Sequence, residues 1–360
     1  MKKFLLTLSA FIFAVASAAA YDPPIQGENL FYLSHPELLT GGISTAGGGI
    51  QSVLPASGTI NPALVGLEER VSVDLGYTMM FNSKPHDGRY GSEIIGNNLI
   101  IYDNYGHSKV GYSQAFGTGI IIPTDWANFG GEMQFILDEK CMDLGDSFHL
   151  KSFASKQIIQ NLFVGVGLGF GYEWKYHDDW MLTIDAGALY HFGDLAFMKN
   201  FRVAASANNI GKTLNSSSDW QGYPGVMAFR VGAAAEFLRT DDFVLGASLD
   251  VTTPLFMNLI IDSGIQFRIK DFVQINSSWE FNAWEAGNGC NSWLPTLGLV
   301  FKFNIGMGSS DFVKKHDWTK SEISPSVAWK NVDWDVNLIG FGAVLRLGQL
   351  DDSGPDIEIE

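Results

Sequence analysis

The chain has 360 residues, of which 17% are charged, 13% are aromatic and 40 are glycine. Its net charge of −16 at pH 7 argues against nucleic acid and anionic lipid surfaces as partners, because both repel an acidic protein. Few charges combined with many glycines and aromatic residues are typical of a β-barrel wall rather than of a soluble α/β enzyme.

Residues 1–20 have the pattern of a signal peptide, which predicts export. Lys2 and Lys3 form a basic n-region, residues 4–15 form an apolar h-region, and the small residues that follow offer a cleavage site before Tyr21. The apolar stretch is too short to span a bilayer of ~30 Å as an anchor helix. Because no later stretch is long and apolar enough either, a membrane location after export requires a closed β-barrel.

Residues 21–69 fit neither a helix nor a strand pattern. Within them, residues 41–63 are rich in glycine and alanine and end in Asn61, Pro62 and Ala63. Glycine is permissive in backbone conformation and buries no side chain, so such a stretch would be disordered as a free surface loop. We predict instead that residues 21–69 form a hatch packed inside a barrel, where small residues let the backbone pass close to the wall.

The clearest strand signal follows the hatch, in residues 70–82, where apolar and polar residues alternate with a period of two. Membrane strands need ~9–11 residues and show the same weak alternation between turns. On this basis residues 70–348 are predicted to form an all-β, transmembrane, antiparallel barrel of about 14 strands. An even number suits a barrel with both termini on the periplasmic side. The candidate strands are 70–82, 107–122, 127–137, 147–157, 162–174, 180–191, 200–209, 225–238, 242–253, 258–269, 272–283, 293–304, 324–335 and 337–347.

Glycines occupy one face of the candidate strand 162–174. Gly165, Gly167, Gly169 and Gly171 alternate with large apolar residues. Their strict spacing of two, with no acidic partner after a βα turn, does not match a dinucleotide-binding loop. A glycine face indicates a strand against which another stretch of backbone lies closely.

Several tryptophans fall at or just beyond the ends of the candidate strands. In a membrane barrel such residues form the aromatic belts at the two interfaces. The alternative is the ordinary enrichment of aromatic residues in strands. The residues concerned are Trp126, Trp174, Trp180, Trp284 and Trp293.

The strand map assigns most of the long loops to the outer side of the membrane, with residues 305–323 as a long inner exception. It also puts Cys141 and Cys290 on the outer side. They are able to form a disulfide in an oxidising compartment, and two unrelated thiols are the alternative. Residues 349–360 hold an excess of acidic residues and are expected to be a solvated tail.

The sequence carries no recognisable catalytic or cofactor signature, so we expect neither an enzyme nor a bound cofactor or metal. The histidines lack metal-ligand spacing, and no phosphate-binding lysine or nucleophile elbow is present. His177, Asp178 and Asp179 fall in a short predicted loop, where a solvated turn accounts for them. Glu173 and Asp185 lie on predicted strands, where an inward-facing wall position explains both.

The order of these features resembles the FadL family of outer-membrane transporters of hydrophobic compounds, and in particular its spirochaetal branch. The resemblance rests on a cleaved signal, a small-residue stretch ending in Asn61, Pro62 and Ala63, and a long alternating first strand. Further fragments that fit are residues 185–190 and the run 201–211. The chain departs from most such barrels by ending in an acidic tail rather than in an aromatic strand end.

The resemblance implies a fourteen-stranded barrel plugged by a hatch, in the outer membrane of a diderm bacterium. Asn61, Pro62 and Ala63 match the hatch motif and are the predicted gating residues; no ligand-contact residues carry over. The implied partners are outer-membrane lipid and a hydrophobic small molecule such as a long-chain fatty acid, which passes the hatch and leaves sideways through the wall. The alternative is a surface-binding or secretion-accessory barrel without transport, and the hatch argues against an open porin.

Overall fold

The structure is a computed structural model. The residues that it describes are 30–41, 43–50, 53–82, 91–95, 98–102, 112–138, 146–174, 179–213, 226–287, 292–308, 310–316, 318–332, 336–348 and 356–357. The predicted signal peptide, Cys141 and Cys290 lie outside these ranges, as do His177 and Asp178.

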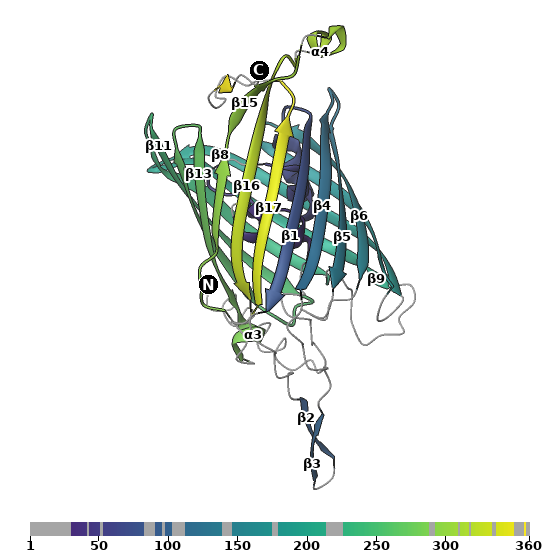
Figure 1. Cartoon of the computed structure of the whole chain (residues 1–360). Helices are drawn as coiled ribbons and strands as arrows, with labels where there is room; N and C mark the ends of the chain where they lie inside the picture. Colours follow the sequence, from purple (N-terminus) through teal and green to yellow (C-terminus); the bar gives the residue numbers. More distant parts are fainter. Residues whose placement is uncertain are drawn as a thin grey trace.

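The wall of the molecule is a closed antiparallel β-barrel (Figure 1), as predicted. It closes because β1 pairs with both β4 and β17, and β14 pairs with both β13 and β16. β14 and β15 are two halves of one wall strand, interrupted at Lys302, so the wall has fourteen strands. The strands are β1 (Ser72–Asn82), β4 (Tyr112–Pro123), β5 (Asn128–Asp138), β6 (Ser147–Ile159), β7 (Leu162–Glu173), β8 (Asp179–Leu195), β9 (Met198–Thr213), β10 (Ala228–Arg239), β11 (Phe243–Pro254), β12 (Ile260–Ile269), β13 (Val273–Asn282), β14 (Leu297–Phe301), β15 (Phe303–Gly306), β16 (Lys320–Val332) and β17 (Val336–Arg346).

Over the described residues the candidate strand 107–122 is confirmed as one strand, because Gly117 pairs with Gly76 on β1 and β4 runs through without a turn. Other predicted boundaries differ from the structure: β8 and β9 end several residues later than predicted, and β16 starts several residues earlier. The prediction of one strand over 293–304 is wrong in its boundaries. Residues 293–296 precede β14, because Pro295 cannot donate a ladder hydrogen bond.

A hairpin and two short helices lie at the ends of the barrel. β2 (Gly91–Ile95) and β3 (Asn98–Tyr102) form a hairpin that projects from one end, which we call the hairpin end (Figure 1). Helix α3 (Ala283–Gly287) lies at that end, and α4 (Asp311–Lys315) lies at the opposite one, the α4 end. The strand ends that border the predicted outer loops lie at the hairpin end.

At the α4 end, β18 (Asp356–Ile357) pairs in parallel with β15. The expectation that residues 349–360 are solvated stays a prediction, because strand pairing of two of these residues does not determine their exposure. β13 starts at Val273, which pairs with Phe301 at the end of β14. β15 follows β14 and therefore has no β13 residue beside it, so the edge of β15 that faces away from β16 is open. An open strand edge readily accepts another strand, and the chain's own tail supplies one.

Side chains alternate between lipid-facing and lumen-facing positions along the wall. On β7, Val166 and Leu168 are each 59% exposed, whereas the intervening glycines face the lumen. Trp174, Trp180 and Trp293 are exposed at the hairpin end, and Trp126 is exposed at the α4 end. An apolar outer band bordered by aromatic residues is the surface that a membrane barrel presents to lipid.

Leu168→Arg should destabilise the protein in a bilayer by ~2–4 kcal/mol, because it places a charge near the middle of the apolar band. Ile159→Arg is the matched control: its side chain is 60% exposed, but it lies at the α4 end of β6, where the same change costs ~0–1 kcal/mol. Urea titration of unfolding from lipid vesicles measures both. Equal destabilisation by the two substitutions would contradict the assignment of this face to lipid.

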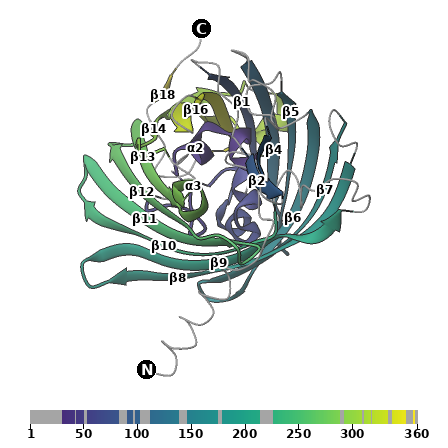
Figure 2. The ribbon, with the colours of Figure 1, turned by 90° about the horizontal axis from the view of Figure 1, so that it is seen from below.

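Residues 30–69 lie inside the barrel (Figure 2), and we call them the lumen segment. They form short helices only: η1 (Leu30–Ser34), α2 (Pro36–Leu39), η2 (Pro55–Thr59) and η3 (Pro62–Leu67). Each of the last three has a proline at its first turn, which fits there because the missing amide hydrogen would have no intrahelical acceptor.

Candidate functional site

The lumen segment lies directly against glycines of the wall. A Cβ atom added at Gly165 would overlap with the backbone of Pro62 and Ala63, and one added at Gly187 would overlap with the Asn61 side chain. Conversely, a Cβ atom added at Gly41 of the lumen segment would lie 2.6 Å from Ser278 Cβ on the wall. These positions have no room for a side chain, and at Gly165 the space is taken by another stretch of backbone. The prediction of close backbone approach along β7 is confirmed at Gly165.

The three predicted gating residues lie together at this contact. Asn61 is fully buried; its Oδ1 accepts from Ala63 N at 3.0 Å, which caps η3. Its Nδ2 donates to the carbonyl of Thr45 at 3.0 Å and to that of Ala188 on β8 at 3.4 Å. Asn61 thus joins η3, another part of the lumen segment and the wall.

Polar side chains of the wall hold much of the lumen segment by hydrogen bonds to its backbone. Buried backbone groups outside regular ladders need such partners, since an unpaired one is costly. The donors and acceptors are Asp74, Asn128, Gln134, Ser155, Arg202, Ser206, Asn208, Asp250, Gln266 and Arg346, which come from strands all around the barrel. They bond to residues at 30, at 45–50 and at 53–68.

Residues 35–41 of the lumen segment are held differently. Within the part of the chain that the structure describes, no wall side chain makes a hydrogen bond to their backbone. The bonds that their backbone makes are local, such as Leu38 N to His35 O at 3.0 Å. They contact the wall through van der Waals contacts, including Pro36 and Leu39 against Gly340 and Thr40 against Gly298, and through the electrostatic interaction of the Glu37 side chain with Arg346. This stretch can therefore move without leaving wall hydrogen bonds unmade.

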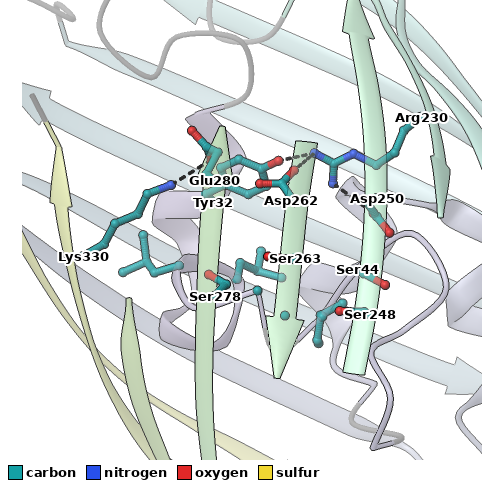
Figure 3. A pocket seen from close by; sticks show the side chains of 15 residues that line it. Tyr32, Ser44, Arg230, Ser248, Asp250, Asp262, Ser263, Ser278, Glu280 and Lys330 are labelled. Atoms are coloured by element: carbon teal, nitrogen blue, oxygen red, sulfur yellow. Dashed lines mark hydrogen bonds and ion pairs between the residues drawn. The ribbon is translucent and has the colours of Figure 1, made fainter. Parts of the chain in front are cut away.

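A pocket of about 30 Å³ lies between residues 38–44 and the wall (Figure 3). The apolar part of its lining comes from the lumen segment, with Leu38, Leu39 and Ile43. The polar part comes mostly from β10, β11, β12, β13 and β16, and the lumen segment adds Tyr32 and Ser44 to it. Its polar residues are Tyr32, Ser44, Arg230, Ser248, Asp250, Asp262, Ser263, Ser278, Glu280 and Lys330.

Two cations and three carboxylates meet at this pocket. Arg230 lies 3.8 Å from Asp262 and 4.0 Å from Asp250, and it donates a hydrogen bond to the Tyr32 hydroxyl. Lys330 Nζ lies 3.2 Å from Glu280 Oε2. Figure 3 shows these side chains pointing toward one another from neighbouring strands. Tyr32 is the point where the lumen segment joins the charged cluster.

Burial controls the ionisation of the lumen segment's own titratable groups. It raises the pKa of the Tyr32 phenol to about 12, against the opposing effect of Arg230, so Tyr32 stays neutral. It lowers the pKa of His35 to about 3, and Arg346 acts in the same direction. It raises the pKa of Glu37 above its usual value, while Arg346 opposes it. Desolvation penalises the charged form in each case.

A second buried cluster joins β6, β8 and β9. Lys151 Nζ lies 2.7 Å from Asp185 Oδ2 and 2.7 Å from Asn209 Oδ1, and it sits 4.4 Å from the centre of the Phe31 ring. Lys151 is 1% exposed and Asp185 is fully buried. The inward-facing position expected for Asp185 is confirmed, and its role in the wall is to pair with a buried lysine.

Lys151→Ala should destabilise the folded barrel by ~3–5 kcal/mol, because it leaves the buried Asp185 carboxylate without its cation. Lys199→Ala is the control. Lys199 Nζ lies 2.8 Å from Asp194 Oδ2, a separation similar to that of the buried pair, but the Lys199 side chain is 44% exposed. Exposed pairs contribute little, so this variant should unfold like the unsubstituted protein. Denaturant unfolding in detergent gives both values, and equal losses would contradict the account.

The described residues show no metal centre and no membrane helix. No three or more His, Cys, Asp or Glu side chains among them are grouped so as to hold a metal ion. Likewise, no helix in the described ranges is long and apolar enough to cross a membrane.

Sequence reasoning missed the charged cluster at the pocket entirely. Arg230, Asp250, Asp262, Glu280 and Lys330 lie on five strands and come together only when the barrel closes. The one signal available was the presence of charged residues within strands that are otherwise apolar and small, since such residues face a barrel's interior.

No family model and no curated protein matches the sequence. Among solved structures, the chain is similar to the toluene transporter TbuX of Ralstonia pickettii, with 12% identity over 89% of this chain and 98% of that one, at a TM-score of 0.45. It is also similar to a FadL homologue of Pseudomonas aeruginosa, with 11% identity, 84% and 98% coverage and a TM-score of 0.44. The toluene transporter TodX of Pseudomonas putida is similar with 12% identity over 85% of this chain and 96% of that one, at a TM-score of 0.43.

Proposed function

We propose that the protein carries hydrophobic small molecules such as long-chain fatty acids across the outer membrane of a diderm bacterium. The observation that carries this proposal is a barrel whose lumen is filled by its own chain, with one stretch of the filling, residues 35–41, whose backbone makes no hydrogen bond to a wall side chain among the described residues. That stretch borders a pocket with an apolar side. A filled lumen excludes water flow, and a movable part of the filling provides a dry route for an apolar solute.

Asn61, Pro62 and Ala63 would then act as the fixed end of the gate. Their bonds to Ala188 and Ser155 anchor them to the wall, whereas residues 35–41 supply the movement. This division refines the role inferred from the hatch motif. Membership of the spirochaetal branch of the FadL family rests on that motif and on the strand fragments, and we propose it on those residues alone.

The exit that we propose is the seam between β13 and β16. The β13–β14 ladder covers Val273–Asn276 only, and residues 292–296 run past the rest of β13 without forming a strand. The Lys330–Glu280 ion pair crosses this stretch on the lumen side, next to the pocket. A ladder with few hydrogen bonds opens at lower cost than a complete one, so a solute in the pocket would reach lipid here.

Uptake in a diderm host that lacks its own fatty-acid channel tests the proposal. Vesicles of phospholipid alone are unsuitable, because fatty acids cross them unaided. Expression of the full chain should give saturable uptake of radiolabelled oleate without entry of a large sugar. Sugar entry at the same rate would indicate an open porin, and no oleate uptake from correctly folded protein would refute transport.

The projecting β2–β3 hairpin supports a second candidate, a barrel that binds a macromolecule at its hairpin end. Deleting residues 91–102 distinguishes the two. Under the transport proposal oleate uptake survives the deletion. Under the alternative, neither the full chain nor the deletion variant takes up oleate, and the deletion abolishes binding of the protein to its macromolecular partner.

A further inference from the structure

The polar side of the lumen pocket is built to receive a cationic head group rather than an anionic one. We propose that this pocket selects amphiphiles with a primary ammonium head. The inference rests on the proposed transport function and concerns which solutes that same site prefers. Its basis is the sign, the exposure and the hydrogen-bonding type of the groups that line the pocket.

Charge gives the first argument. The pocket lining holds three carboxylates and two cations, so its formal charge is −1 when all are ionised. Arg230 is engaged by Asp250, Asp262 and the Tyr32 hydroxyl, and Lys330 is engaged by Glu280. A fatty-acid carboxylate entering here would meet the excess negative charge, whereas an ammonium group would neutralise it.

Exposure gives the second argument. The Asp262 side chain is 27% exposed and that of Glu280 is 17% exposed, whereas Arg230 is 8% exposed and Lys330 is 9% exposed. Of the paired groups at the pocket, the two carboxylates are thus more accessible to a ligand than the two cations. Asp250, at 1% exposed, lies deeper than the other two carboxylates: its Oδ2 accepts from Thr45 N at 2.7 Å, and its Oδ1 lies against Gly232 of β10.

Donor count and size give the third argument. An ammonium group has three donors and no acceptor, and the pocket offers it carboxylates together with the hydroxyls of Ser248, Ser263 and Ser278. A volume of about 30 Å³ holds a group the size of one or two water molecules. It therefore suits a primary ammonium better than a trimethylammonium. The alkyl chain would lie along Leu38, Leu39 and Ile43.

The test measures binding of three probes with the same chain length, dodecylammonium, dodecanoate and dodecanol, to the full chain in phosphatidylcholine nanodiscs at pH 8. We expect dodecylammonium to bind at least about tenfold more tightly than dodecanoate, the size of one charge-assisted hydrogen bond. In the variant Asp262→Asn with Glu280→Gln this preference should disappear, while dodecanol affinity stays unchanged. Asp242→Asn is the control. It removes a carboxylate that is 63% exposed and that lies at the α4 end of the barrel, just before β11, whereas the pocket lies toward the hairpin end.

Four results separate the possibilities. Dodecanoate binding as tightly as dodecylammonium would overturn the inference. So would an equal loss of preference in the Asp242→Asn variant, because the effect would then come from overall charge. Oleate uptake by the host cells without any ammonium preference would leave the transport function standing and refute only the head-group selectivity. Absence of both binding and uptake for every probe would refute the transport function itself.

Discussion

A disulfide between the variants Thr40→Cys and Gly298→Cys should stop oleate uptake, and a reducing agent should restore it. A Cβ atom at position 298 would lie 3.2 Å from Thr40 Cβ, close to the separation of two Cβ atoms joined through a disulfide. The bond would tie residues 35–41 to β14 at the seam. Because we propose that this stretch moves to admit the solute, fixing it removes the route without unfolding the barrel.

The matched control ties the anchored part of the lumen segment to the wall. Gly66→Cys with Ser155→Cys places two Cβ atoms 3.4 Å apart, between the end of η3 and β6. This bond should leave uptake unchanged in both redox states. Both pairs are introduced after replacing Cys141 and Cys290 by serine, so that no other disulfide forms. If the two locks inhibit uptake equally, the lumen segment moves as one body and the division into anchor and gate is wrong.

The alternation of apolar and polar residues predicts the barrel wall well, because each wall residue faces either lipid or the lumen. The prediction of fourteen strands is confirmed, and the period of two places Leu168 and its glycine neighbours on the correct faces. Errors arise where local chemistry overrides the alternation. Pro295 delays β14, and the wall strand breaks at Lys302, so that a stretch predicted as one strand is two.

The candidate site was only partly predictable, because its two halves depend on different information. Asn61 and Pro62 carry a local signal that the neighbouring residues in the sequence are enough to reveal: a helix-capping residue followed by a proline in the first turn of the helix. The pocket depends on contacts between residues far apart in the sequence. Tyr32 meets Arg230 across 198 positions, and Lys330 meets Glu280 across 50. Such pairs follow from strand register around a closed barrel, which alternation alone does not determine.

Gly165→Ala should displace the anchor and make the barrel leak. Gly165 faces the lumen on β7, and an added Cβ would overlap with the backbone of Pro62 and Ala63. All three of the nearest atoms are backbone atoms of Pro62 and Ala63, so a side-chain rotation cannot relieve the overlap. Overpacking of this kind costs ~1–3 kcal/mol, which the lumen segment can avoid by moving off the wall. Planar-bilayer recordings should show conductance steps that the unsubstituted protein lacks, together with faster proteolysis within residues 53–69.

Gly131→Ala is the control for the same substitution. A Cβ atom at Gly131 would approach nothing closer than Lys151 O at 3.4 Å, an ordinary contact, so conductance and proteolysis should stay unchanged. The comparison isolates the contact with Pro62 from the general effect of replacing a wall glycine. A silent Gly165→Ala variant would mean that the lumen segment tolerates displacement at its anchor. In that event Asn61, Pro62 and Ala63 would have no part in keeping the lumen closed, and the gate would depend on residues 35–41 alone.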